Sequence, residues 1–282
     1  MKTVNDFNEY KILSLSDGKK IESWNGVILN RPDPNVIWKD SKDIKCDAIY
    51  ERSNKGGGEW KNYNAPAKWQ IHYKNLTFNL KLMGFKHTGL FPEQAYNWNI
   101  IIDKIKSSKK HVKVLNLFAY TGGASIAALS AGASVVHVDS SRGMIDWAKE
   151  NVKASKLEDR DIRFLVDDCK KFVKREIRRG NKYDIIIMDP PSFGRGSKNE
   201  VWDIEKDLFD LVNDCSNLLS DCPIMFLINS YTTALPMTSI ENVLKLCVQS
   251  KFKGKIETDE LGLRCDNSDL VLPCGIYSRW ER

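Results

Sequence analysis

The residues best suited to chemistry follow an apolar stretch, at Asp189-Pro190-Pro191-Ser192-Phe193. The preceding residues 183–188 (Tyr-Asp-Ile-Ile-Ile-Met) predict a buried strand. Two prolines directly after a strand exclude helix and stiffen the turn, so the backbone carbonyls and the Asp189 carboxylate are held in fixed directions. Fixed acceptors can orient a nitrogen while it receives a small group, and Phe193 can cover a planar base. The turn therefore predicts a group-transfer site.

Two other predicted strands also end in acidic residues. Residues 134–138 are β-prone and lead into Asp139 and Ser140, where a carboxylate can accept hydrogen bonds from ribose hydroxyls. Residues 162–166 form the next apolar run, which ends in Asp167 and Asp168. One aspartate can accept from an adenine amine while the other caps the following helix, and Asp168 is favoured for the ligand.

A glycine turn joins the central predicted strand to a helix. Residues 112–117 favour a strand, Phe118–Gly122 a turn, and residues 124–129 a helix. This strand–turn–helix corner is where doubly wound sheets cradle their ligands. A dinucleotide site requires Gly-x-Gly-x-x-Gly for close approach to a pyrophosphate, whereas this segment has one late glycine pair. The pattern favours S-adenosylmethionine (SAM), which has no pyrophosphate.

Strands and helices alternate from residue 112 onward, which predicts an α/β fold with a doubly wound, Rossmann-like sheet. Pro92 opens a helix expected to reach about residue 105, with Gln94 at its mouth, where it can face a ligand. Later elements are expected as helices at 142–155, 201–219 and 239–250, and as strands at 223–229, near 256 and at 270–272.

Residues 1–85 predict a small β-rich N-terminal domain, and residues 86–282 a catalytic domain. Residues 69–73 and 76–82 alternate across Lys74-Asn75, which predicts a hairpin. The N-terminal tryptophans could stack on nucleic-acid bases, although a packed core is the simpler interpretation for most of them.

The composition of this 282-residue chain is that of a soluble globular protein, with a net charge of +6. No stretch approaches the roughly 20 apolar residues of a membrane span, and the N-terminus lacks the apolar core of a signal peptide. Seven cysteines without a CxxC pair favour neither a disulfide framework nor a zinc site. We therefore expect a cytoplasmic protein with no metal and no membrane partner. The positive charge permits RNA binding, as does a basic face expected on the helix after Asp168, although a solvated face is the simpler interpretation.

Together these motifs resemble the class I SAM-dependent methyltransferases, and more narrowly the bacterial branch related to large-subunit ribosomal RNA methyltransferases. The resemblance rests on Asn116–Gly123 (NLFAYTGG), Val138–Ser141 (VDSS) and Asp189–Gly194 (DPPSFG). Three flanking segments also resemble those of the family, namely Thr88–Gln94, Ile228–Thr233 and Leu272–Gly275.

The resemblance implies a mostly parallel seven-stranded sheet, SAM as cofactor, S-adenosylhomocysteine (SAH) as product, and ribosomal RNA as partner. The loop Phe118–Gly122 would hold the methionine part, Asp139 the ribose and Asp168 the adenine, while Asp189–Phe193 would form the transfer site. The full cofactor set that it implies is Gln94, Asn116, Phe118, Ala119, Tyr120, Thr121, Gly122, Asp139, Ser140 and Asp168.

Two departures from the family pattern bear on the chemistry. Ser192 stands between the proline pair and the aromatic that usually follows it directly, and it also stands where cytosine-C5 enzymes often carry a nucleophilic cysteine. Cys274, after Pro273, is the similarly placed alternative, but a buried structural cysteine is the better interpretation. Direct transfer without a covalent enzyme intermediate is therefore favoured.

Alternatives remain at this stage. The acceptor could be a small molecule or a protein, and the fold could serve an NAD-dependent oxidoreductase or a non-catalytic module that binds SAM or RNA. The missing dinucleotide fingerprint and the Asp-Pro-Pro turn favour the methyltransferase.

Overall fold

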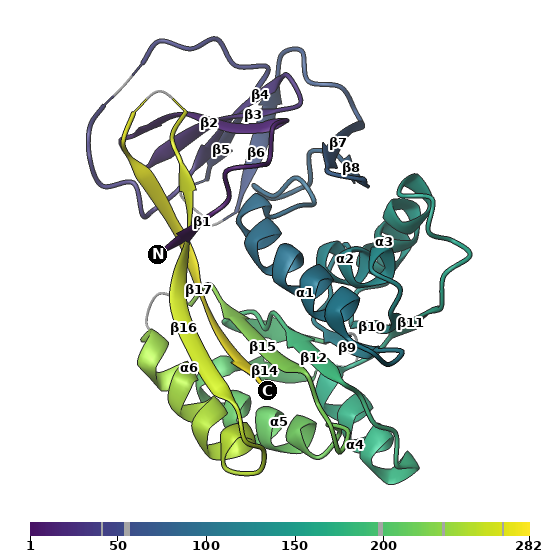
Figure 1. Cartoon of the computed structure of the whole chain (residues 1–282). Helices are drawn as coiled ribbons and strands as arrows, with labels where there is room; N and C mark the ends of the chain where they lie inside the picture. The colour runs from purple at the N-terminus through teal and green to yellow at the C-terminus, as the bar shows by residue number, and fades with distance from the viewer. Residues whose placement is uncertain (41, 54–56, 197–199, 233–234, 267) are drawn as a thin grey trace. The chain divides into compact units, whose positions relative to one another are not determined.

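The computed structural model describes residues 1–40, 42–53, 57–196, 200–232, 235–266 and 268–282. They form two compact units (Figure 1). The first contains Met1–Tyr96 and Leu261–Cys274, and the second contains Asn97–Glu260 and Gly275–Arg282. The domain boundary at residue 85 stays a prediction.

The first unit is rich in β-structure. Its strands are β1 (Lys2–Thr3), β2 (Tyr10–Ser16), β3 (Lys19–Trp24), β4 (Val27–Pro32), β5 (Ala48–Arg52), β6 (Gly58–Asn62), β7 (Trp69–Tyr73) and β8 (Leu76–Leu80). Strands β2 to β6 form a sheet in sequence order, and β7 and β8 form the expected hairpin, with Tyr73 opposite Leu76. Trp24 is fully buried, with its ring 4.7 Å from that of Tyr10, which confirms a core role for this tryptophan.

The helices are α1 (Ala95–Ser107), α2 (Gly123–Ser130), α3 (Arg142–Ala154), α4 (Cys169–Arg179), α5 (Ile204–Ser216) and α6 (Met237–Leu244). A 3₁₀ turn, η1 (Pro92–Gln94), precedes α1, and a π-helical turn, η2 (Lys245–Gln249), follows α6. The remaining strands are β9 (Lys113–Leu117), β10 (Ser134–Asp139), β11 (Ile162–Val166), β12 (Ile185–Met188), β13 (Phe193–Arg195), β14 (Val201–Asp203), β15 (Met225–Ser230), β16 (Lys255–Arg264) and β17 (Val271–Glu281).

The main sheet confirms the doubly wound fold. Its order is β1-β16-β17-β15-β12-β9-β10-β11, so the described residues give seven long strands with the two-residue β1 added beside β16. Strands β15, β12, β9, β10 and β11 are parallel, and β17 runs antiparallel to β15. The chain winds outward from β9 through β10 to β11 and then returns to β12 on the other side of β9. Ligands bind at such a reversal, beyond the carboxyl ends of the strands.

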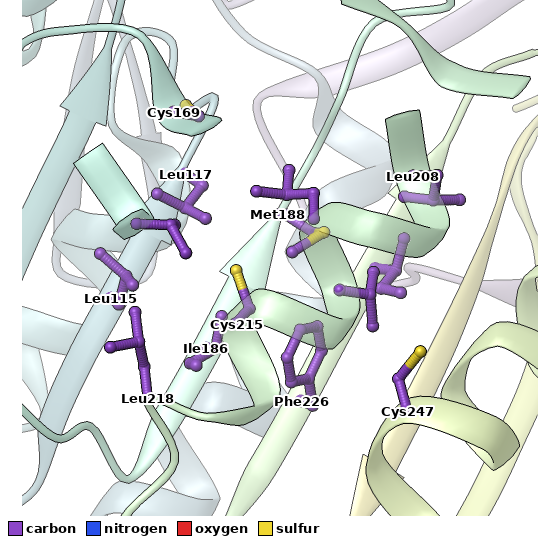
Figure 2. Close-up of a cluster of buried hydrophobic side chains, with 14 of the residues drawn as sticks. Leu115, Leu117, Cys169, Ile186, Met188, Leu208, Cys215, Leu218, Phe226 and Cys247 are labelled. Carbon is purple, nitrogen blue, oxygen red and sulfur yellow. The ribbon is translucent and has the colours of Figure 1, made fainter. Parts of the chain in front are cut away.

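Successive residues of β9 face opposite sides of the sheet, as the two-residue period of a strand requires. Leu115 and Leu117 join a buried apolar cluster with residues of α4, α5 and α6, including Cys169, Cys215 and Leu208 (Figure 2). Asn116 lies between these two leucines in the sequence and donates a hydrogen bond to Ser125 of α2. One face of the sheet is therefore covered by α4 to α6, while Asn116 faces the layer of α2.

The prediction of a helix over residues 201–219 was wrong for the first three residues. Residues 201–203 form β14, which pairs with β13, and α5 begins only at Ile204. The Asp203 carboxylate caps this helix by accepting from the Glu205 amide at 3.2 Å. An N-cap residue is extended rather than helical, which explains why the helix cannot extend back through Asp203.

Candidate active site

The loop Phe118–Gly122 leaves the carboxyl end of β9 with an unusual backbone. Phe118, Tyr120 and Gly122 all have positive φ angles, of 52°, 50° and 92°. Non-glycine residues in this left-handed region each cost of order 1 kcal/mol, and such strain gathers at ligand sites. Gly122 is the N-cap of α2, and a Cβ on it would lie 3.2 Å from the Ala148 side chain. The predicted glycine turn is therefore present and closely packed.

Asp139 ends β10 beside this loop. One carboxylate oxygen accepts from the Tyr120 amide at 2.9 Å and the other from the Ser141 amide at 2.8 Å. Burial raises the pKa of Asp139 above its ordinary value, and the two amide donors oppose that shift. The carboxylate thus shapes the loop and is half-buried at the sheet edge, while the next residue, Ser140, is exposed.

Asp167 and Asp168 lie at the end of β11, next to Asp139. The Asp167 amide donates to the Asp139 carbonyl at 3.0 Å, which joins the two strand ends. Asp168 is the N-cap of α4 and accepts from the Lys171 amide at 2.9 Å, while Asp167 pairs with Arg175. The capping role therefore belongs to Asp168, the aspartate favoured for the ligand. Its contact with adenine stays a prediction.

A buried polar chain lies beneath the loop. The Asn116 amide donates to the Ser125 hydroxyl at 2.9 Å, and this hydroxyl lies 2.9 Å from Nδ1 of His137. All three side chains are at most 3% exposed. Ser125 and His137 were not predicted from the sequence, although each is a polar residue within an apolar element. Asn116 is placed under the loop, where it supports α2.

His137 should make the protein sensitive to acid. Burial lowers the pKa of His137 to about 3, from an ordinary 6.5. Between these values the unfolded chain binds the proton and the folded chain does not, so the free energy of unfolding falls as pH drops from 6.5 towards 3. The loss should be about 1.4 kcal/mol per pH unit at most.

The measurement is urea unfolding at pH 7 and pH 4.5 for wild type and His137→Gln. The variant should lose less stability between the two pH values. His111→Gln, at an exposed histidine of the same unit, serves as the control and should lose as much as wild type. Equal losses in all three proteins would contradict a role for His137.

The turn Asp189–Phe193 leaves the carboxyl end of β12, adjacent to β9. The Asp189 amide donates to the Leu117 carbonyl at 3.4 Å, so the turn begins directly beside the loop Phe118–Gly122. Asp189 is half-buried and Pro190 is buried, whereas Pro191, Ser192 and Phe193 are exposed. The Ser192 hydroxyl lies 2.6 Å from the Thr232 hydroxyl, just after β15. Thr233, the last residue of the family-like segment Ile228–Thr233, lies outside the described residues.

Trp202 is a further residue of this region that the sequence did not predict, because its segment was expected to be helical. Its indole N–H donates to the Pro191 carbonyl at 2.6 Å, and its ring centroid lies 4.9 Å from that of Phe118. In β14, Trp202 is buried, whereas Val201 is exposed and Asp203 is half-buried.

The basic face expected on α4 is present, but acidic groups pair with much of it. Lys170 pairs with Asp207 at 3.0 Å, Lys171 with Glu200 at 2.6 Å, and Arg179 with Glu176 at 3.0 Å. Paired cations attract phosphates less strongly, so this helix favours the solvated face over a nucleic-acid groove.

Within the described ranges, no three His, Cys, Asp or Glu side chains are grouped so that they could hold a metal ion. No helix in the same part of the chain is long and apolar enough to cross a bilayer. Cys274 lies in the first unit, and burial raises the pKa of its thiol well above the ordinary value. A thiol that resists ionisation is a poor nucleophile.

The geometry suits a nucleoside cofactor without pyrophosphate. A strained loop, a carboxylate at the next strand end and a proline-stiffened turn meet where the sheet reverses its winding. These groups could hold a ribose and orient an acceptor atom, and left-handed φ angles such as those of Phe118 and Tyr120 are common at ligand sites.

Comparison with known proteins identifies the family. Residues 36–230 match the model of the S-adenosylmethionine-dependent methyltransferase family. A crystal structure of the SAM-dependent methyltransferase from Agrobacterium tumefaciens is 31% identical with a TM-score of 0.93, and the match covers 99% of this chain and 92% of that one. The chain is also 30% identical to the ribosomal RNA large subunit methyltransferase K/L of Colwellia psychrerythraea over 67% of its length, and 39% identical to that of Shewanella frigidimarina over 46%.

The chain spans only 24% and 18% of the lengths of these two curated relatives. The family match, in contrast, extends from the first unit through the loop Phe118–Gly122 and the turn Asp189–Phe193 to the end of β15. The chain belongs to the S-adenosylmethionine-dependent methyltransferases.

Proposed function

We propose that this methyltransferase transfers the methyl group of SAM directly to a base of large-subunit ribosomal RNA, at the turn Asp189–Phe193. The observation that carries the proposal is the adjacency of this turn to the loop Phe118–Gly122, across neighbouring parallel strands β12 and β9. A transfer site requires its cofactor loop and its acceptor turn side by side.

The proposed cofactor residues follow the strand ends. The loop Phe118–Gly122 binds the methionine part, Asp139 with Ser140 binds the ribose, and Asp168 binds the adenine. Asn116 donates to Ser125 of α2. A contact of Gln94, a residue of the first unit, with the cofactor stays a prediction from the sequence. Bound SAM supplies a methyl group on a positively charged sulfur.

The proposed acceptor site uses the oxygens of the turn. The Asp189 carboxylate and the Pro190 carbonyl accept hydrogen bonds from the substrate, which directs a base nitrogen towards the methyl group. The Pro191 carbonyl already accepts from Trp202, and the Ser192 carbonyl accepts from the Ile204 amide at 3.1 Å. Phe193 is 57% exposed and can stack on the base.

Ribosomal RNA is proposed because the curated relatives are named as ribosomal RNA large subunit methyltransferases, and because the net charge of +6 suits a polyanion. A ribosomal substrate places the enzyme in the cytoplasm. The raised pKa of the Cys274 thiol supports direct transfer over a covalent intermediate.

The proposal is tested by incubating the enzyme with methyl-labelled SAM and with total RNA, protein or small metabolites from cells that lack it. We expect label in large-subunit ribosomal RNA, where digestion and mass analysis then identify the nucleotide. Label confined to protein or small molecules would reject RNA as the substrate. The control is enzyme with Asp189→Ala, which should label the same RNA far more slowly.

A further inference from the structure

Trp202 joins the two loops that meet at the carboxyl ends of β9 and β12. It lies in β14, opposite Gly194 of β13, and its side chain is buried, with the residue only 6% exposed. Strands β13 and β14 form a short hairpin that follows the turn Asp189–Phe193. The hairpin therefore brings an aromatic side chain back onto the turn that begins it.

The first contact of Trp202 is with this turn. Pro190 and Pro191 have no backbone N–H, so the polar backbone groups that they contribute are carbonyls. The Trp202 indole donates to the Pro191 carbonyl at 2.6 Å, and two residues later the Ile204 amide holds the Ser192 carbonyl at 3.1 Å. The turn is thus held at two successive carbonyls, one by Trp202 of β14 and one by the first residue of α5, which fixes the direction of the preceding Pro190 carbonyl and Asp189.

The second contact of Trp202 is with the glycine loop. Its ring lies 4.9 Å from the Phe118 ring at an interplanar angle of 55°. Phe118 has a φ of 52°, and its side chain packs against the buried cluster that contains Cys169. The position of Phe118 is therefore fixed by packing. A movement of its ring must displace Trp202, because packed aromatic side chains cannot shift independently.

We infer that Trp202 is a positioning residue that couples the cofactor loop to the acceptor turn. Its N–H sets the orientation of the turn, and its ring transmits the position of Phe118 to Pro191. This inference rests on the proposed transfer site at Asp189–Phe193, and it assigns Trp202 no contact with substrate or cofactor.

Two substitutions separate the two contacts. Trp202→Phe keeps an aromatic ring beside Phe118 and removes the N–H from Pro191. We expect kcat for methylation of large-subunit ribosomal RNA to fall at least about tenfold, with the Kd for SAH, measured by calorimetry, unchanged within about twofold. Trp202→Leu removes both contacts and should lower kcat at least as far.

The matched control is Trp280→Phe. Trp280 is fully buried in the same unit, and its indole N–H has no hydrogen-bond partner among the described residues. This variant should unfold at a lower temperature while it retains the wild-type kcat. A fall in kcat that matched that of Trp202→Phe would show a general packing effect and overturn the inference.

Hydrogen–deuterium exchange with SAH tests the coupling without any substrate. In wild type, SAH should slow exchange both in residues 118–122 and in residues 192–195. In Trp202→Leu, the protection of 118–122 should remain and that of 192–195 should be lost. Equal protection of 192–195 in both proteins would overturn the inference. Failure of wild type to methylate ribosomal RNA would reject the proposed substrate only, because the exchange comparison still decides the role of Trp202.

Discussion

Asp189→Ala should lower the rate of methyl transfer at least about 100-fold, because the acceptor nitrogen loses a fixed hydrogen-bond partner in the transition state. The Asp189 side chain is half-buried at the end of β12, whose backbone is held by β9 and β15. Its removal should therefore leave the strand and the glycine loop in place. The affinity for SAH should change by less than about twofold.

The measurement is single-turnover labelling of large-subunit ribosomal RNA, with calorimetry of SAH in parallel. Asp189→Asn is the matched variant, because the amide keeps an acceptor oxygen of the same shape and loses the charge. Partial activity in this variant would assign the role to hydrogen bonding, and activity equal to that of Asp189→Ala would assign it to charge. Full turnover with alanine would reject the proposed transfer site.

Asp139→Ala should weaken SAH binding roughly 10- to 100-fold, since a hydrogen bond to a charged group contributes about 1.5–3 kcal/mol. Two losses combine here. The ribose loses its proposed acceptor, and the Tyr120 amide loses the carboxylate oxygen that now lies 2.9 Å away. The second loss releases a loop in which Phe118 and Tyr120 have left-handed backbones, and such conformations persist only while their surroundings enforce them.

Calorimetry with SAH checks this prediction, with two companion variants. Asp139→Asn keeps an acceptor for the Tyr120 amide and should lose less affinity than alanine. Asp146→Ala, at an exposed acid of α3 that pairs with Lys149 at 3.4 Å, controls for the loss of one negative charge and should bind normally. Unchanged affinity in Asp139→Ala would exclude Asp139 from the cofactor site.

Burial of Asp139 should also make the affinity for SAH dependent on pH. The pKa of Asp139 lies above its ordinary value of 3.8, so its carboxylate is protonated at a higher pH than that of an exposed aspartate. A protonated carboxyl accepts more weakly, and SAH affinity should therefore begin to fall earlier as the pH is lowered.

The sequence by itself determined the features that depend on local chain chemistry. Proline fixes its own φ angle and removes a donor wherever it stands, so the Asp-Pro-Pro turn at the end of β12 was predictable from its letters. Gly122 likewise indicates the turn before α2, and in the structure it is the N-cap of that helix, with a left-handed φ of 92°. The alternation of apolar runs with helical segments was sufficient for the doubly wound class, because each run can be buried only by the elements that flank it.

The tertiary structure decided which side chains meet. Asn116 and the leucines beside it share one apolar strand, and only the packing of α2 shows that the amide turns to Ser125 under the loop. Asp167 and Asp168 are adjacent acids, and only the position at which α4 begins shows that Asp168 is its N-cap. Trp202 lies 11 residues from Pro191 in the sequence, yet hairpin formation brings its N–H onto that carbonyl. Each of these outcomes depends on contacts between separate elements, whose free energy exceeds the local preferences that a sequence pattern reports.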